Sequence, residues 1–181
     1  MRRKAILFLL LLCLLLSACG GTGPVADSFA GRVEGSEAFI AIVTNGERVL
    51  AYFCNGQPGA EVTLYGWFRG ELDGNVFDLT DESGDRLIGE IDSNGARGTV
   101  TPVGGSALAF EAGPVGEPFG LYRVEGTFDG VEYIGGEIVL PNGERRGATR
   151  GGNQFVSSYI ELNLPGAGKL TPQFIDPLDD L

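Results

Sequence analysis

The segment Phe39-Ile40-Ala41-Ile42-Val43-Thr44-Asn45-Gly46-Glu47-Arg48-Val49-Leu50-Ala51-Tyr52 decides the fold, because it places an apolar run on either side of an Asn-Gly pair. Asn-Gly supplies the positive φ angles that a type I′ hairpin turn requires. The flanking runs are rich in β-branched and aromatic residues, which favour strands. Both runs are apolar on both faces. We therefore expect an antiparallel hairpin that is covered on both sides, by a second packed layer or by a loop.

The same kind of turn signal recurs along the chain, at Asn55-Gly56, Asp73-Gly74, Ser83-Gly84, Asn94-Gly95, Asp129-Gly130 and Asn142-Gly143. Between the signals lie short segments with strand composition, and none shows apolar residues at helical spacing over three turns. The predicted strands are 39–44, 48–54, 61–72, 76–80, 86–92, 96–103, 106–112, 121–127, 133–140, 145–150 and 154–164. The pattern predicts an all-β antiparallel meander that forms a closed or nearly closed barrel of 8–11 strands, with a two-sheet sandwich as the alternative.

The predicted strand 61–72 alternates clearly between two faces. Val62, Leu64 and Phe68 belong to the face that we expect to point inward. Tyr65, Trp67 and Arg69 share the other face, and an exposed Trp-Tyr-Arg patch is typical of a binding surface for a sugar or a protein. Trp is usually well buried, so the alternative is that a loop or the C-terminal tail covers Trp67.

Two parts of the chain carry similar sequences. Arg32-Val33-Glu34-Gly35 matches Arg123-Val124-Glu125-Gly126, and Asn45-Gly46-Glu47-Arg48 matches Asn142-Gly143-Glu144-Arg145. Our hypothesis is that these two similar ends meet and close the sheet into an up-and-down barrel without exposed edges.

The composition excludes several kinds of chemistry. The chain has no His, which removes Ser–His and Cys–His nucleophilic systems and His-ligated zinc. Among the carboxylates, the acidic turns 73–75 and 78–85 offer oxygen ligands for Ca²⁺, but neither has EF-hand spacing and ordinary turns explain both. Cys54 ends an apolar run, and we expect a buried structural thiol, with a reactive thiol as the alternative. We assign no catalytic residue, no metal ligand and no cofactor.

The first residues have the pattern of an export signal. Met1-Arg2-Arg3-Lys4 is positively charged, and Ala5 to Leu16 is an apolar run too short to span a bilayer. The following Leu16-Ser17-Ala18-Cys19 resembles the lipobox of bacterial lipoproteins. The resemblance implies cleavage before Cys19, a diacylglycerol on the Cys19 thiol and attachment to the cell membrane or outer membrane. In a cell with two membranes, Gly in place of Asp at position 20 argues, by the same resemblance, against retention at the inner membrane.

These observations divide the chain into a signal peptide (1–18), a flexible tether (19–29), a β-barrel domain (30–164) and a C-terminal tail (165–181). Without the three basic residues of the leader, ten basic residues face 24 acidic ones, a net charge of −14. Such a surface repels phosphate backbones, so we expect no nucleic-acid partner.

The segment 39–52 also resembles repeats in exported bacterial proteins of unknown function, a likeness that implies no activity. We expect a lipid-anchored extracytoplasmic binding or interaction module whose partner is an envelope protein or a glycan. Two alternatives stay open. One is a carboxylate-dependent hydrolase on a barrel scaffold, and the other is a lipocalin-like carrier of a small apolar ligand.

Overall fold

The computed structural model describes residues 27–128, 130–152, 154–157, 162–164, 168–170 and 173–176, with side chains for 27–127, 130–152 and 173–176. All regular elements in these ranges are strands, which confirms the predicted all-β class. No helix that is long and apolar enough to cross a bilayer occurs in the described part of the chain.

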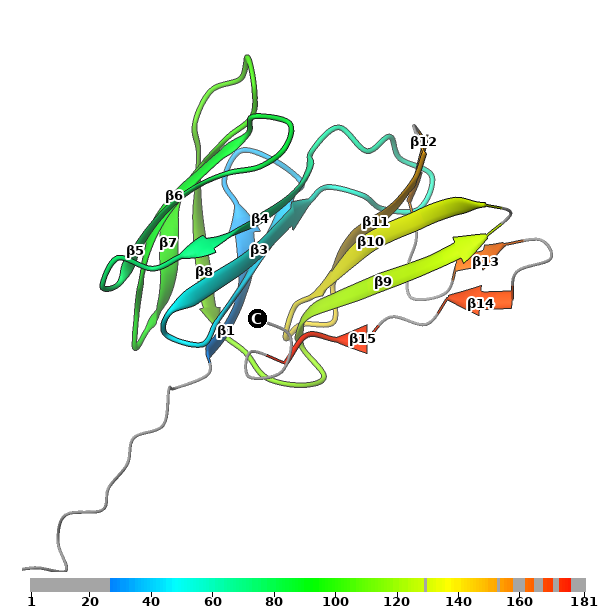
Figure 1. Cartoon of the computed structure of the whole chain (residues 1–181). Coiled ribbons are helices and arrows are strands. Elements are labelled where there is room, and N and C mark those ends of the chain that lie inside the picture. Colours follow the sequence, from blue (N-terminus) through cyan, green and yellow to red (C-terminus); the bar gives the residue numbers. More distant parts are fainter. Residues whose placement is uncertain are drawn as a thin grey trace, which may run out of the picture.

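The first four strands form an antiparallel meander, and the Asn-Gly hairpin lies at its centre (Figure 1). Asn45 Oδ1 accepts hydrogen bonds from the backbone N–H groups of Glu47 and Arg48 at 3.1 and 2.9 Å. Gly46 has a φ of 87°, the left-handed conformation that the turn needs. The strands are β1 (Asp27–Val33), β2 (Phe39–Thr44), β3 (Arg48–Cys54) and β4 (Tyr65–Glu71).

A second four-stranded meander continues the same sheet. Its last strand pairs with β1, which gives eight strands in the order β4-β3-β2-β1-β8-β7-β6-β5. The sheet curls into a nearly closed barrel in which the end strands β4 and β5 approach each other. An added Cβ at Gly70 of β4 would lie 2.4 Å from Leu79 Cδ2 of β5, which shows how close these two strands are. The strands are β5 (Val76–Thr80), β6 (Arg86–Asp92), β7 (Gly95–Thr101) and β8 (Leu108–Pro114).

The interior of the barrel is filled by apolar side chains. They form one buried cluster to which all eight strands contribute, and Phe29, Phe53, Phe68, Phe77 and Phe110 are its aromatic members. Each is at most 3% exposed. A lumen packed in this way stabilises the barrel in the manner of an ordinary hydrophobic core.

A third meander forms a separate five-stranded sheet in the order β12-β11-β10-β9-β15, packed on the outer face of the first meander (Figure 1). Phe39, Tyr52 and Cys54 point into this second core, whereas Ile40 and Phe53 point into the barrel. This confirms that the hairpin 39–54 is covered on both faces, by a second layer. The strands are β9 (Gly120–Phe128), β10 (Val131–Val139), β11 (Arg145–Gly151), β12 (Gln154–Ser157) and β15 (Gln173–Phe174).

The hypothesis that the two similar sequence segments close the barrel is wrong. Arg32 and Asn45 belong to the first meander and Arg123 and Asn142 to the third, and these two meanders stack face to face instead of sharing strand hydrogen bonds. The two Asn-Gly turns are nonetheless built alike, because Asn142 Oδ1 also accepts the N–H of the Glu two residues on, at 3.0 Å.

The boundaries differ from the prediction at both ends of the domain. β1 begins at Asp27, inside the predicted tether 19–29. Within the predicted tail 165–181 the structure has two more strands, β14 (Gly168–Leu170), paired with β13 (Leu162–Leu164), and β15. Ile175 follows β15, is buried, and donates its backbone N–H to the Leu121 carbonyl at 3.0 Å. The chain near its end therefore packs on the second sheet.

Candidate functional site

The predicted binding patch lies on β4, and the second sheet covers most of it. Tyr65 and Trp67 are half-buried, while Arg69 is exposed. The Trp67 ring stacks at a tilt on Tyr52, with ring centres 4.4 Å apart, and an added Cβ at Gly136 of β10 would lie 2.7 Å from the indole. Trp67 is therefore covered, as the alternative expected, and the described residues that lie against it include Gly136 and Arg123 of the second sheet.

The groups around Trp67 join the two sheets. The buried Tyr52 hydroxyl accepts the Ala148 N–H at 3.2 Å, and burial raises the pKa of Tyr52 well above its ordinary value. Burial likewise raises the pKa of Tyr65. The Arg123 guanidinium lies over the indole, 5.7 Å from its centre. These contacts make the face of β4 a packing surface between layers.

The other half of the barrel presents its outer face to solvent. In Figure 1, β5, β6 and β7 lie on the side of the barrel away from β9–β11. We call the outer face of β5–β8 the open face, because no described residue packs over it. It carries a groove of about 580 Å³ with an apolar wall. Val76 and Ile88 line this groove, and their side chains are 43% and 38% exposed.

Two glycines lie at the floor of the groove. One row of paired residues crosses the strands as Phe77, Gly89, Gly98 and Phe110, so two large rings flank two residues without side chains. An added Cβ at Gly89 would lie 2.6 Å from Phe77 Cζ, and one at Gly98 would lie 2.0 Å from the Ile88 carbonyl oxygen. Neither position therefore has room for a side chain, and Gly89 and Gly98 line the groove.

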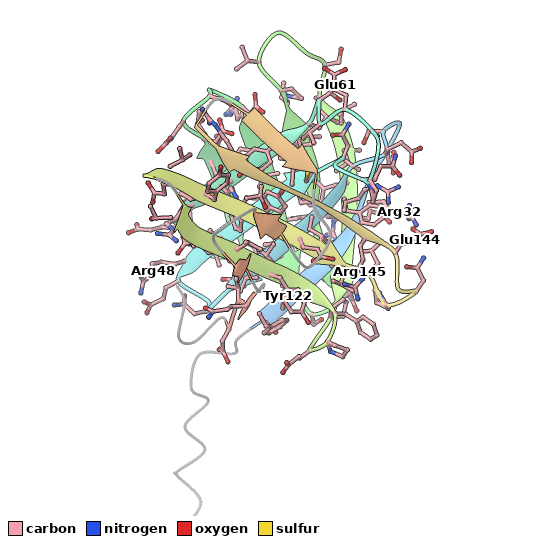
Figure 2. The ribbon with its side chains drawn as sticks, turned by 90° about the vertical axis from the view of Figure 1, so that its right-hand side faces the viewer. Arg32, Arg48, Glu61, Tyr122, Glu144 and Arg145 are labelled. Atoms are coloured by element: carbon pink, nitrogen blue, oxygen red, sulfur yellow. The ribbon has the colours of Figure 1, made fainter. Side chains whose placement is uncertain are left out.

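A ladder of alternating charges crosses the open face, with Glu90, Arg97, Glu111 and Arg32 directly opposite one another on β6, β7, β8 and β1. Arg97 pairs with Glu90 at 2.6 Å and with Asp92 at 3.0 Å. The hydrogen bond from the Asn94 backbone, followed by that from Arg97, lowers the pKa of Asp92. Arg32 pairs with Glu144, in the turn between β10 and β11 (Figure 2). Both cations of the ladder are therefore held in ion pairs.

Two carboxylates of the groove have no such partner. The side chains of Glu34 and Glu111 make no hydrogen bond or ion pair with any residue that the structure describes, and both are exposed. The Glu34 N–H donates a hydrogen bond to the Ala109 carbonyl at 2.8 Å, so Glu34, the residue after β1, lies opposite Ala109 of β8. Glu111 is two positions further along β8. Both also line an adjoining hollow of about 470 Å³, whose far wall includes Leu140 and Pro141 of the second sheet.

No family model matches the chain, and neither the curated proteins nor the solved structures include a match to it. The functional argument therefore rests on the geometry of this chain alone.

Cys54 does not line the groove. Cys54 is buried, its sulfur accepts the Gly56 N–H at 3.1 Å, and burial raises the pKa of its thiol. This confirms the expectation of a buried thiol. Cys19 lies outside the described residues, so its acylation stays a prediction.

The acidic turns use their carboxylates within the protein. Asp81 Oδ1 accepts the N–H groups of Ser83 and Asp85, both at 2.9 Å, and Asp78 binds Arg86 through two hydrogen bonds. Across the ranges with described side chains, no three His, Cys, Asp or Glu residues are placed to hold a metal ion.

The sequence reasoning did not single out the groove. One signal was present in 86–91, where Leu87, Gly89 and Ile91 point inward and Ile88 interrupts the polar outer face. A single exposed apolar side chain is common on protein surfaces, so this signal alone does not mark a site. The proximity of Glu34 and Glu111 had no local signal, since it depends on the pairing of β1 with β8.

Proposed function

We propose that this protein is a binding module, tethered outside the bacterial cytoplasm by lipid on Cys19, that docks a partner protein on the open face of its barrel. The observation that carries the proposal is the contrast between the two sides of the barrel. One outer face is covered by a second sheet, and the other leaves Val76 and Ile88 exposed in a groove. Exposed apolar groups that share one hollow are typical of interaction sites.

The packed lumen supports docking at the surface over carriage of a ligand inside. A carrier of the lipocalin kind needs an interior chamber, whereas large aromatic side chains fill this barrel. The groove and the adjoining hollow both open at the surface.

The carboxylates that line the groove and the hollow give less support to the hydrolase alternative. A general acid usually sits where burial favours its protonated form. The neighbouring carboxylates of Glu34 and Glu111 are instead exposed.

The tether sets the geometry of such a module. Seven residues, 20–26, separate Cys19 from β1. Fully extended, they reach about 25 Å at most, so a lipid on Cys19 would hold the barrel next to the membrane surface. The partner would then be another component of the cell envelope.

Site-specific photo-crosslinking in living cells tests the docking proposal. A photoreactive amino acid at Thr99, in the groove, should give a discrete adduct, and the same group at Glu132, on the second sheet, should not. Adding Val76→Ser and Ile88→Ser should remove the adduct while the circular-dichroism spectrum is retained. Equal adducts from both positions would contradict the proposal.

The anchor needs its own test. Labelling with a radioactive fatty acid should modify the wild-type chain and leave Cys19→Ala unlabelled. Equal labelling of the two would rule out acylation at Cys19.

A further inference from the structure

We infer that the partner segment that occupies the open-face groove is basic as well as apolar: a stretch of another protein with alternating Lys or Arg and aliphatic residues. The inference rests on the proposed function and names the chemistry of the partner. Three observations support it: the apolar row of the groove, the unpaired carboxylates beside that row, and the negative charge of the competing occupants.

The apolar part of the groove has the dimensions of a short extended peptide. Ile88, Thr99 and Ala109 lie opposite one another on β6, β7 and β8, and Val76 adds a wall on β5. Val76 is offset by two positions, because Asp78 is the residue opposite Ile88, so the apolar residues run obliquely across four neighbouring strands at about 4.8 Å spacing, a width of about 15 Å. Four or five residues of an extended chain span this length, with alternate side chains directed at the row.

The charges at the end of this row favour a cation. Ala109 ends the row, and the unpaired Glu34 and Glu111 lie beside it. In and around the groove the cations are Arg32, Arg86 and Arg97, and each is held by an ion pair. The carboxylates there exceed these three guanidinium groups by three: Glu34, Asp78, Glu90, Asp92, Glu111 and Glu144.

A Lys or Arg side chain placed at Glu34 and Glu111 would add an attraction without breaking any ion pair within the protein. The aliphatic part of such a side chain can also lie along the apolar row. Each exposed charge contact is modest, and two contacts together amount to about tenfold in affinity.

The competing occupants carry the wrong charge. The end of this chain contains Asp176, Asp179 and Asp180, which Glu34 and Glu111 would repel. A second copy docked through the same face about a two-fold axis would bring together two surfaces with the same excess of carboxylates. An anionic lipid headgroup meets the same repulsion.

The experiment measures binding of fluorescent eight-residue peptides to the full-length protein in a neutral detergent, by anisotropy. One peptide alternates lysine with leucine, and its matched forms carry glutamine or glutamate in place of every lysine. We expect the lysine peptide to bind at least tenfold more tightly than the glutamine form and the glutamate form to bind more weakly still. Its affinity should fall as salt rises from about 0.05 to 0.3 M.

Two pairs of variants assign the binding to the groove. The pair Glu34→Gln and Glu111→Gln should weaken the lysine peptide about tenfold. The control pair Glu61→Gln and Glu132→Gln changes the net charge equally at exposed sites away from the groove, and should change the affinity less than twofold (Figure 2 labels Glu61). Equal effects of the two pairs would mean that only the overall charge matters, and would overturn the inference.

A third pair separates failure of the inference from failure of the proposed function. Val76→Ser and Ile88→Ser remove the apolar wall without changing charge. If the glutamine peptide binds as tightly as the lysine peptide and this pair abolishes both, the groove docks a segment but the basic character is wrong. If no peptide binds and the crosslink from Thr99 is also absent, both ideas fail.

Discussion

The Arg146 guanidinium lies 4.6 Å from the centre of the Phe39 ring, so β11 of the second sheet is joined to β2 of the barrel through a cation–π contact. Arg32 lies over the same ring at 4.7 Å. Phe39 has no exposed surface, and Arg146 is further held by the carbonyl and the carboxylate of Glu37 at 3.0 and 3.2 Å. This cluster fixes how the two layers sit on each other.

Replacing Arg146 by Met should therefore destabilise the domain. We expect a loss of about 2 kcal/mol in the free energy of unfolding, because a nearly buried cation–π contact and three hydrogen bonds, the third to the Arg145 carbonyl, disappear. Urea denaturation followed by circular dichroism measures the loss. Arg48→Met, at an exposed site, is the control and should change the stability by less than about 0.5 kcal/mol. A similar loss in both variants would argue against the role of the Phe39 contact.

Trp67 should behave as a packing residue. Its position between the sheets leads us to expect a loss of about 2–4 kcal/mol for Trp67→Ala, and less than about 1.5 kcal/mol for Trp67→Phe. Trp67 is the chain's only Trp, so its emission reports directly on this site and should shift to the red on unfolding. Arg69→Ala, on the same face but exposed, should leave the melting temperature nearly unchanged. An unchanged melting temperature for Trp67→Ala would indicate that the second sheet does not pack on β4.

The close approach of β6 and β7 at Gly98 should tolerate no side chain. Gly98→Ala would bring a Cβ to 2.0 Å from the Ile88 carbonyl oxygen, so the sheet must move. We expect a loss of about 3 kcal/mol or more in the free energy of unfolding. Gly113→Ala on β8 is a matched control, since an added Cβ there meets no atom within 4 Å. Thermal unfolding of the two variants, compared side by side, decides the question, and equal melting temperatures would count against this close approach.

Cys54 should be unreactive in the folded protein. Burial raises the pKa of its thiol, and the thiolate is the form that reacts. We expect no labelling by Ellman's reagent at pH 8 in buffer and one labelled thiol at position 54 after addition of guanidinium chloride. A chain that begins at Gly20 is used, so that Cys13 and Cys19 do not contribute. Fast labelling under native conditions would instead indicate that the second sheet opens readily.

Asp78 should titrate below the usual range of aspartate. The hydrogen bonds from Arg86, at 2.8 and 2.5 Å, lower the pKa of the Asp78 carboxyl. A lowered pKa in the folded state means that the pair stabilises the protein above the ordinary aspartate pKa, and that this contribution is lost as pH falls through the folded value. Carboxyl ¹³C NMR titration should show the Asp78 pKa rise in Arg86→Met and stay the same in Arg69→Met. No difference between the two variants would refute the pairing.

The strands with a strong local pattern could be predicted from sequence. The strands 39–44, 48–54, 76–80 and 86–92 have their predicted bounds, because each lies beside a turn signal and contains mostly strand-forming residues. β1 was missed because its sequence, Asp27-Ser28-Phe29-Ala30-Gly31-Arg32-Val33, has few strand-forming residues. Its conformation depends on neighbours on both sides, β2 and β8, which only the tertiary structure supplies.

The candidate site was less accessible to sequence reasoning. Trp67, Tyr65 and Arg69 were correctly placed on one face of a strand, but a sequence does not say which outer face a second sheet will cover. The groove depends on residues from four strands, and Glu34 and Glu111 meet only because β1 pairs with β8. Contacts between residues so distant in the chain have no local signature.

The first meander has a consequence for how the whole domain melts. Side chains from β2 and β3 belong alternately to the barrel core and to the core under the second sheet. Neither layer can detach without wetting an apolar face of these shared strands. The two hydrophobic cores are therefore thermodynamically linked, and calorimetry should record a single two-state endotherm in place of separate transitions for the barrel and the sheet.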